Sequence, residues 1–86
     1  MSENMDYTMK FESLTSDEMS VSQAIDLVYD ALKEKGYNPI NQIIGYILSG
    51  DSSYVTGHNN ARAIIKRFER DEILEEIVTY YLNNRK

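Results

Sequence analysis

Side chains able to do catalytic chemistry are few in this sequence. His58 is the only histidine, it lies in a polar stretch, and the chain contains no cysteine. The absence of cysteine excludes thiol catalysis, disulfide bonds and cysteine-based zinc sites. A solvated loop position is the commoner setting for a lone histidine, so we expect His58 to be neither a general base nor a metal ligand.

Carboxylates form the second group of side chains that could do chemistry. They gather near the C-terminus at Glu69, Asp71, Glu72, Glu75 and Glu76. The helix dipole favours acidic residues in a first helical turn, and no Glu-x-x-His motif accompanies these. The glycines Gly50 and Gly57 also lack the Gly-Lys-Ser/Thr ending of a phosphate-binding loop. We therefore predict no enzymatic activity, no cofactor and no metal site.

Basic residues near position 66 form a pattern of their own. Arg62, Lys66 and Arg70 are spaced four residues apart, so one helix would align them in a stripe, with Arg67 beside it. No acidic residue interrupts this stripe, although the chain has a formal net charge of −5. A solvated helix face is the simpler interpretation. We predict instead a partner-binding surface for an acidic protein, a phosphate or the chain's own acidic N-terminal segment.

Hydroxyl groups in the N-terminal segment are the remaining side chains that could have a chemical function. Residues 1–19 contain five acidic residues against Lys10 alone, and they show no helical periodicity. This composition is typical of a flexible segment that cannot bury a core. Its hydroxyl-bearing residues are Ser2, Thr8, Ser13, Thr15 and Ser16. We predict a flexible acidic regulatory tail over residues 1–19 and a helical domain over residues 20–86.

Length and charge limit the class of protein. With 86 residues, the chain falls below the roughly 100–200 residues of a typical domain, so we expect one domain with a thin core. The net negative charge argues against a nucleic-acid footprint. The longest apolar run is too short for a membrane span or a secretion signal. These features predict a cytoplasmic protein that neither binds nucleic acid nor inserts into a membrane.

Two helices are predicted in the first part of the domain. One covers about residues 21–35, where apolar residues recur with helical spacing after a capping box of Ser20 and Gln23. The next begins at Asn38-Pro39, a cap followed by a proline in the first turn. Within it Gly45 costs about 1 kcal/mol relative to alanine, which predicts a close approach of another segment. Three aliphatic residues of this helix are expected at the centre of the core: Ile44, Ile47 and Leu48.

A polar loop and further helices complete the domain. Residues 51–60 form a loop by composition, and another helix starts near residues 59–60. The apolar stripe of residues 73–82 is out of phase with the preceding one, which predicts a break near Arg70 with Asp71 as the new cap. The fold is therefore expected to be all-α, a small compact bundle of four to five short helices. Two of these helices carry aliphatic stripes that one monomer cannot cover, which predicts a homodimer.

A long contiguous block resembles the signature of a known family. Residues 35–51 (Lys-Gly-Tyr-Asn-Pro-Ile-Asn-Gln-Ile-Ile-Gly-Tyr-Ile-Leu-Ser-Gly-Asp) are similar to the IreB/ReoM regulatory phosphoproteins of low-GC Gram-positive bacteria. Asn60-Ala61-Arg62, residues 69–73 and Thr8-Met9-Lys10-Phe11 match as well. The resemblance departs from the family pattern at residues 52–57, where the usual loop prolines and loop arginine are absent.

The resemblance implies a homodimer without enzymatic activity. It further implies that a membrane Ser/Thr kinase with extracellular cell-wall-sensing repeats phosphorylates a tail threonine. The matching residue is Thr8, and Thr15 is a second candidate. Family members act in cell-envelope homeostasis by adjusting the proteolysis of an early peptidoglycan-synthesis enzyme through the Clp protease, which affects β-lactam tolerance. The partners so implied are a Ser/Thr kinase and proteins linked to Clp or to cell-wall biosynthesis.

Two other functions compete with this reading. A small helical DNA-binding protein could present Arg62, Lys66, Arg67 and Arg70 to phosphates from a helix-turn-helix. The loop after Gly50 is too long for the usual turn of that motif, and the charge of the chain has the wrong sign. A carboxylate metalloenzyme is the third candidate, and it would need a metal retained through purification.

Overall fold

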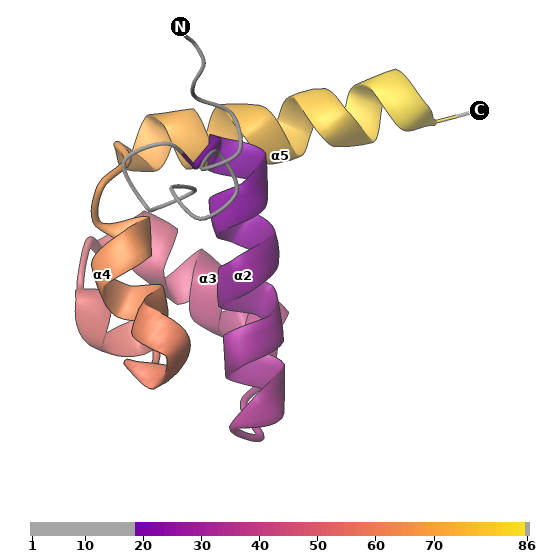
Figure 1. Ribbon diagram of the computed structural model, residues 1–86. Helices are drawn as coiled ribbons and strands as arrows, with labels where there is room; N and C mark the ends of the chain where they lie inside the picture. The colour runs from indigo at the N-terminus through magenta and orange to yellow at the C-terminus, as the bar shows by residue number, and fades with distance from the viewer. Residues whose placement is uncertain (1–18, 86) are drawn as a thin grey trace, which may run out of the picture.

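The fold is all-helical over the part of the chain that the structure describes. The computed structural model describes residues 19–85, so the predicted tail apart from Met19 lies outside it. The elements in chain order are α2 (Val21–Glu34), α3 (Pro39–Ser49), the 3-10 turns η2 (Ser52–Tyr54) and η3 (His58–Asn60), α4 (Ala61–Ile65) and α5 (Arg70–Asn84) (Figure 1). The predicted fold class is confirmed, and the dimer remains a prediction.

Both ends of α2 are formed by the residues that the sequence indicated. The Ser20 hydroxyl accepts from the Gln23 backbone N–H at 3.1 Å, and Gln23 Oε1 accepts from the Ser20 N–H at 2.9 Å. This is the predicted capping box. At the other end Gly36 has φ +86°, and the Tyr37 N–H donates to the Leu32 carbonyl at 3.0 Å. A glycine in the left-handed region with this bond forms a Schellman stop.

The ends of α3 were also predicted, but its buried face was not. Asn38 Oδ1 accepts from the Asn41 N–H at 3.1 Å, and Gly50 ends the helix with φ +77°. Ile43 and Tyr46 are buried, whereas Ile44 is 48% exposed and Leu48 is 78% exposed. The expectation that Ile44 and Leu48 centre the core is therefore wrong, while Ile47 packs partly buried against the core. Only one face of α3 meets α2, so the other half of its aliphatic residues points outward.

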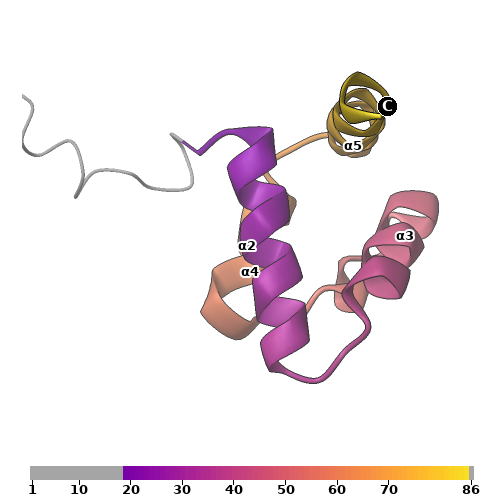
Figure 2. The ribbon, with the colours of Figure 1, turned by 90° about the vertical axis from the view of Figure 1, so that its right-hand side faces the viewer.

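Helix α2 is the central element of the bundle. It packs against α3, α4 and α5, which lie around it (Figures 1 and 2). The largest fully buried side chains come from three helices and the loop: Leu32, Ile65, Ile73, Val28 and Val55. Val55 is the apolar anchor by which the loop joins this core.

A break separates α4 from α5, as the phase of the apolar stripes predicted. Helix α4 ends at Ile65 and α5 starts at Arg70. The cap is Glu69 rather than the predicted Asp71, and the Glu69 N–H donates to Glu72 Oε1 at 2.9 Å. Helix α5 therefore begins two residues earlier than expected, and Ile73 in its first turn is 1% exposed and lies in the core.

Helix α5 crosses one end of α2, and its C-terminal half extends beyond the bundle (Figure 1). Exposed apolar side chains occur along α5: Leu74, Val78, Tyr80, Tyr81 and Leu82. Within residues 19–85, no helix combines the length and the apolar character that crossing a bilayer requires.

Candidate partner-binding surface

The loop that departs from the family pattern is held firmly against α3. The Gln42 side-chain amide donates to the Tyr54 carbonyl at 2.9 Å, and Val55 is fully buried. Asn59 and Asn60 both adopt left-handed backbone conformations, with φ 55° and 64°. Asparagine is one of the few residues that visits this region readily. Contacts to α3 and to the core therefore hold this loop in place, although it lacks the prolines that the family pattern has there.

Asp51 organises the first turn of this loop. Its Oδ1 accepts from the Ser53 backbone N–H at 2.9 Å. This bond, followed by the Ser53 hydroxyl, lowers the pKa of the Asp51 carboxyl below its ordinary value, and the charge of Arg62 adds to the effect. Hydrogen bonds to a carboxylate favour its ionised form. The folded chain therefore favours the ionised Asp51 carboxylate, and Arg62 contributes to this through its charge.

Arg62 on α4 holds the loop from its inner side. Its Nε donates to the Val55 carbonyl at 2.8 Å and to the Ser52 carbonyl at 3.1 Å. The two carbonyls bracket η2, so one side chain fixes both ends of this turn. Arg62 therefore has a structural role in addition to any contact with a partner.

Arg70, at the start of α5, closes the C-terminal end of α3. Its Nη1 donates to the Ile47 carbonyl at 2.9 Å. The guanidinium also lies over Gly50, where an added Cβ would lie 2.9 Å from Arg70 Cζ. A cation at a helix C-terminus meets the negative end of the dipole and satisfies a carbonyl that the helix leaves unpaired. Arg70 thus joins α5 to α3.

The basic residues do not form one helical stripe. Because α4 ends at Ile65, Arg62 and Arg70 lie on different helices, and Lys66 and Arg67 lie in the connection between them. The expected single stripe is wrong, and the four residues instead line the α4–α5 junction. Lys66 and Arg67 are exposed. The Lys66 ammonium makes no hydrogen bond or ion pair with the described residues. The partner-binding role of all four residues stays a prediction.

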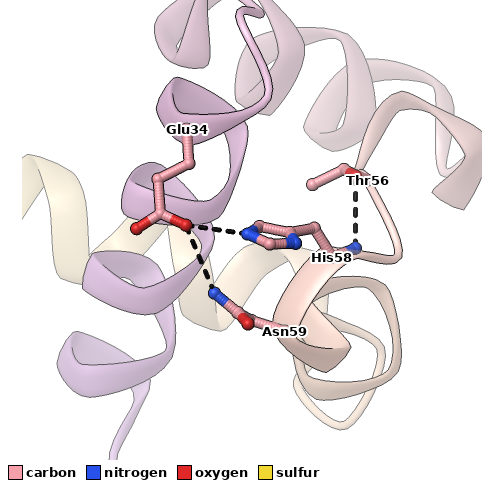
Figure 3. Close-up of polar contacts among 4 residues, drawn as sticks. All are labelled: Glu34, Thr56, His58 and Asn59. Carbon is pink, nitrogen blue, oxygen red and sulfur yellow. Dashed lines mark hydrogen bonds and ion pairs between the residues drawn. The ribbon is translucent and has the colours of Figure 1, made fainter.

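His58 makes a contact that sequence reasoning missed. Its Nε2 lies 2.7 Å from Glu34 Oε1 at the end of α2, and the Asn59 amide approaches the same oxygen at 3.5 Å (Figure 3). The His58 N–H also donates to the Thr56 hydroxyl at 3.2 Å. The histidine therefore ties the loop to α2. Its partner is 24 residues away, and no local sequence pattern signals the contact.

The remaining predicted site residues are two threonines of the N-terminal segment. Thr8 and Thr15 lie outside the described residues. Within residues 19–85, histidine and carboxylate side chains form no group of three or more that could hold a metal ion.

Comparisons with known proteins agree with the sequence signature. The model of a family described as "IreB regulatory phosphoprotein" matches residues 6–83. A UPF0297 protein of Clostridioides difficile (strain 630) is 71% identical over 85 residues, covering 99% of this chain and 100% of that protein. A UPF0297 protein of Lachnoclostridium phytofermentans is 56% identical over 77 residues, covering 90% of this chain and 88% of that protein.

Proposed function

The chain belongs to the IreB family of regulatory phosphoproteins, and from this we propose that it is a non-enzymatic regulator switched by phosphorylation of Thr8. The observation that carries the proposal is the family match over residues 6–83, which includes Thr8 together with the whole helical domain. Thr15 is the second candidate acceptor. The kinase would be a membrane Ser/Thr kinase with cell-wall-sensing repeats, as the family resemblance implies.

Phosphorylation would act through charge. A phosphate adds about −1.5 to −2 charge at pH 7 and three acceptor oxygens. In an N-terminal segment with five acidic residues, this charge either repels an acidic partner or docks the segment onto basic residues. The α4–α5 junction supports docking, because Lys66 is exposed and Arg62 directs only its Nε to the loop carbonyls. A bidentate arginine–phosphate pair would be the strongest such contact.

The proposed output is control of cell-envelope homeostasis. The regulator would act from the cytoplasm. The regulator would adjust the Clp-linked proteolysis of a peptidoglycan-biosynthesis enzyme and thereby antibiotic tolerance. This part of the proposal comes from the family resemblance. The partner surface would be the α4–α5 junction formed by Arg62, Lys66, Arg67 and Arg70.

A homodimer is part of the proposal. Ile40, Ile44 and Leu48 are spaced four residues apart on the outer face of α3, and all three are exposed. Leu74 and Val78 continue this apolar surface on α5, where Leu48 and Leu74 line one groove. Exposed apolar patches of this kind mark interaction sites. We name this surface the α3–α5 face and assign it to a second copy of the chain.

The test of the switch compares wild type with Thr8→Ala after incubation with the cognate kinase. Mass spectrometry should find the phosphate on Thr8 in wild type and little phosphate in the variant. Thr15→Ala is the matched control and should be phosphorylated like wild type. Equal phosphorylation of the Thr8→Ala chain would show that Thr8 is not the principal site.

The DNA-binding alternative has less support. Helix α4 has five residues, which is shorter than the recognition helices that enter a major groove. The basic residues are also divided between two helices and their connection. Salt-dependent binding of the chain to random duplex DNA would favour this alternative.

A further inference from the structure

A groove of about 310 Å³ lies where the N-terminal half of α2 meets the middle of α5. Ser22, Ile25 and Asp26 line it from α2, and Glu76, Ile77 and Tyr80 line it from α5. Ile25 and Ile77 are partly buried and pack against the core, so they form an apolar floor. The volume suits one or two side chains of a partner rather than a whole helix.

The walls of this groove are acidic on both sides. Asp26 and Glu76 face it from different helices, and among residues 19–85 no basic residue lines it. Neither carboxylate has a hydrogen bond or an ion pair with another side chain within residues 19–85. Two carboxylates beside an apolar floor therefore carry negative charge that nothing in the described domain neutralises.

The groove is separate from the α3–α5 face. On α5, Glu76 and Tyr80 are spaced four residues apart and share one flank, which faces α2. Leu74 lies on the other flank with Ile47 and Leu48 of α3, and Val78 follows Leu74 one turn later. A second copy on the α3–α5 face would thus leave the α2 flank accessible.

We propose that this groove docks an arginine-bearing segment of a partner protein. An arginine side chain has an aliphatic stem that can cover Ile25 and Ile77, and a planar guanidinium that can bridge Asp26 and Glu76. The exposed ring of Tyr80 offers a cation–π contact to the same group. Lysine fits less well, because an ammonium is a point charge that neither stacks on a ring nor bridges two carboxylates with planar geometry.

Charge disfavours the other occupants. The chain's own segment 1–19 has five acidic residues and one basic residue, so it would be repelled by Asp26 and Glu76. Nucleic acid and anionic lipid carry phosphates that the same carboxylates would repel. The proposal goes beyond the phosphorylation switch, since the groove includes neither Thr8 nor the α4–α5 junction.

The test uses the full chain, labelled with ¹⁵N, and the synthetic peptide acetyl-Leu-Arg-Leu-Arg-amide. Amide resonances of residues 25–26 and 76–77 should shift on titration. The matched peptide with citrulline in place of each arginine keeps the shape but loses the charge, and it should bind more weakly. The double variant Asp26→Asn/Glu76→Gln should weaken arginine-peptide binding by about 2- to 30-fold, the range expected from two surface ion pairs. Asp30→Asn/Glu75→Gln changes the same charge on the same helices outside the groove, and it should bind like wild type.

Several outcomes would overturn the proposal. One is no shift of the groove resonances at millimolar peptide, and another is equal binding of the citrulline peptide. Equal loss of binding in both double variants would show a general charge effect. If Asp26→Asn/Glu76→Gln changes the sedimentation of the chain, the groove belongs to an interface between copies. If Lys10→Glu shifts the groove resonances without peptide, the chain's own N-terminal segment occupies the groove. None of these results bears on phosphorylation of Thr8, so the two proposals fail separately.

Discussion

Gly45 of α3 lies directly against the ring of Tyr54, so closely that a Cβ added at position 45 would lie 2.5 Å from Tyr54 Cε1. The predicted close approach at this glycine is thereby confirmed. The Gln42 amide, one turn earlier, donates to the carbonyl of the same tyrosine at 2.9 Å. The loop therefore packs on α3 at a position that has no side chain. The loop in turn provides two carbonyls that accept hydrogen bonds from Arg62.

Gly45→Ala should lower the free energy of unfolding by about 1 kcal/mol. Forced overlap with the Tyr54 ring costs about 1–3 kcal/mol, which outweighs the gain of about 1 kcal/mol in helix propensity. In a Tyr54→Ala background the overlap is absent, so the same substitution should stabilise the chain by about 1 kcal/mol. Urea unfolding of wild type, Gly45→Ala, Tyr54→Ala and the double variant measures this reversal of sign. If Gly45→Ala changes the free energy of unfolding in the same direction in both backgrounds, the contact with Tyr54 does not determine the effect of the substitution.

Arg70→Ala should lower the free energy of unfolding by about 1–3 kcal/mol. The variant loses the bond of Nη1 to the Ile47 carbonyl and the positive charge at the end of α3. Lys66→Ala is the matched control, since it removes an exposed cation with no such bond and should change stability by less than about 0.5 kcal/mol. Equal thermal denaturation curves for the two variants would contradict the capping role of Arg70.

The bonds of Arg62 and Arg70 within the fold leave Lys66 as the residue that tests the proposed partner surface. Arg62 and Arg70 both bond to backbone carbonyls, so reversing their charge changes the fold and the surface together. Lys66→Glu changes the surface alone. Slower association of this variant with the physiological partner at low salt would support the proposed surface, and unchanged association would leave Lys66 as a solvated residue.

Asp51→Asn should make stability less sensitive to acid. The pKa of the Asp51 carboxyl is lowered in the folded chain, first by its bond from the Ser53 N–H. The folded state therefore favours the ionised form. This stabilisation is present above the ordinary aspartate pKa of 3.8 and is lost as the pH falls through the lower pKa of the folded chain. The free energy of unfolding, measured from pH 5 downward, should fall less steeply in Asp51→Asn than in wild type. Ser53→Ala keeps the backbone N–H and should give a smaller change than Asp51→Asn.

Leu48→Glu should dissociate the proposed dimer without unfolding the domain. Leu48 is 78% exposed in one copy of the chain, so a charge there is tolerated by the monomer but not by an apolar interface. Ala63→Glu adds the same charge at an exposed position of α4 and serves as the control. Sedimentation should give a dimer for wild type and the control and a monomer for Leu48→Glu. A wild-type chain that sediments only as a monomer at micromolar concentration would exclude the dimer.

Much of the local structure follows from the sequence alone. The Ser20–Gln23 capping box, the Asn38 cap and the stops at Gly36 and Gly50 depend on neighbouring residues, so their types and spacing suffice to place the helix ends. The break before α5 was also predictable, because one continuous helix would have turned acidic residues toward the core. The family signature is likewise a property of the sequence.

The tertiary structure decided which face of each helix is buried and what the basic residues contact. Ile43 and Ile44 are equally apolar neighbours, and only the packing of α3 against the rest of the domain buries the first and exposes the second. Arg62 and Arg70 appear in the sequence as surface charges, but they bond to carbonyls that lie 7 and 23 residues away. The pairing of His58 with Glu34 and the groove between Asp26 and Glu76 likewise join distant residues. Contacts of this kind depend on how helices pack, and a periodic pattern along one helix contains no information about its neighbour.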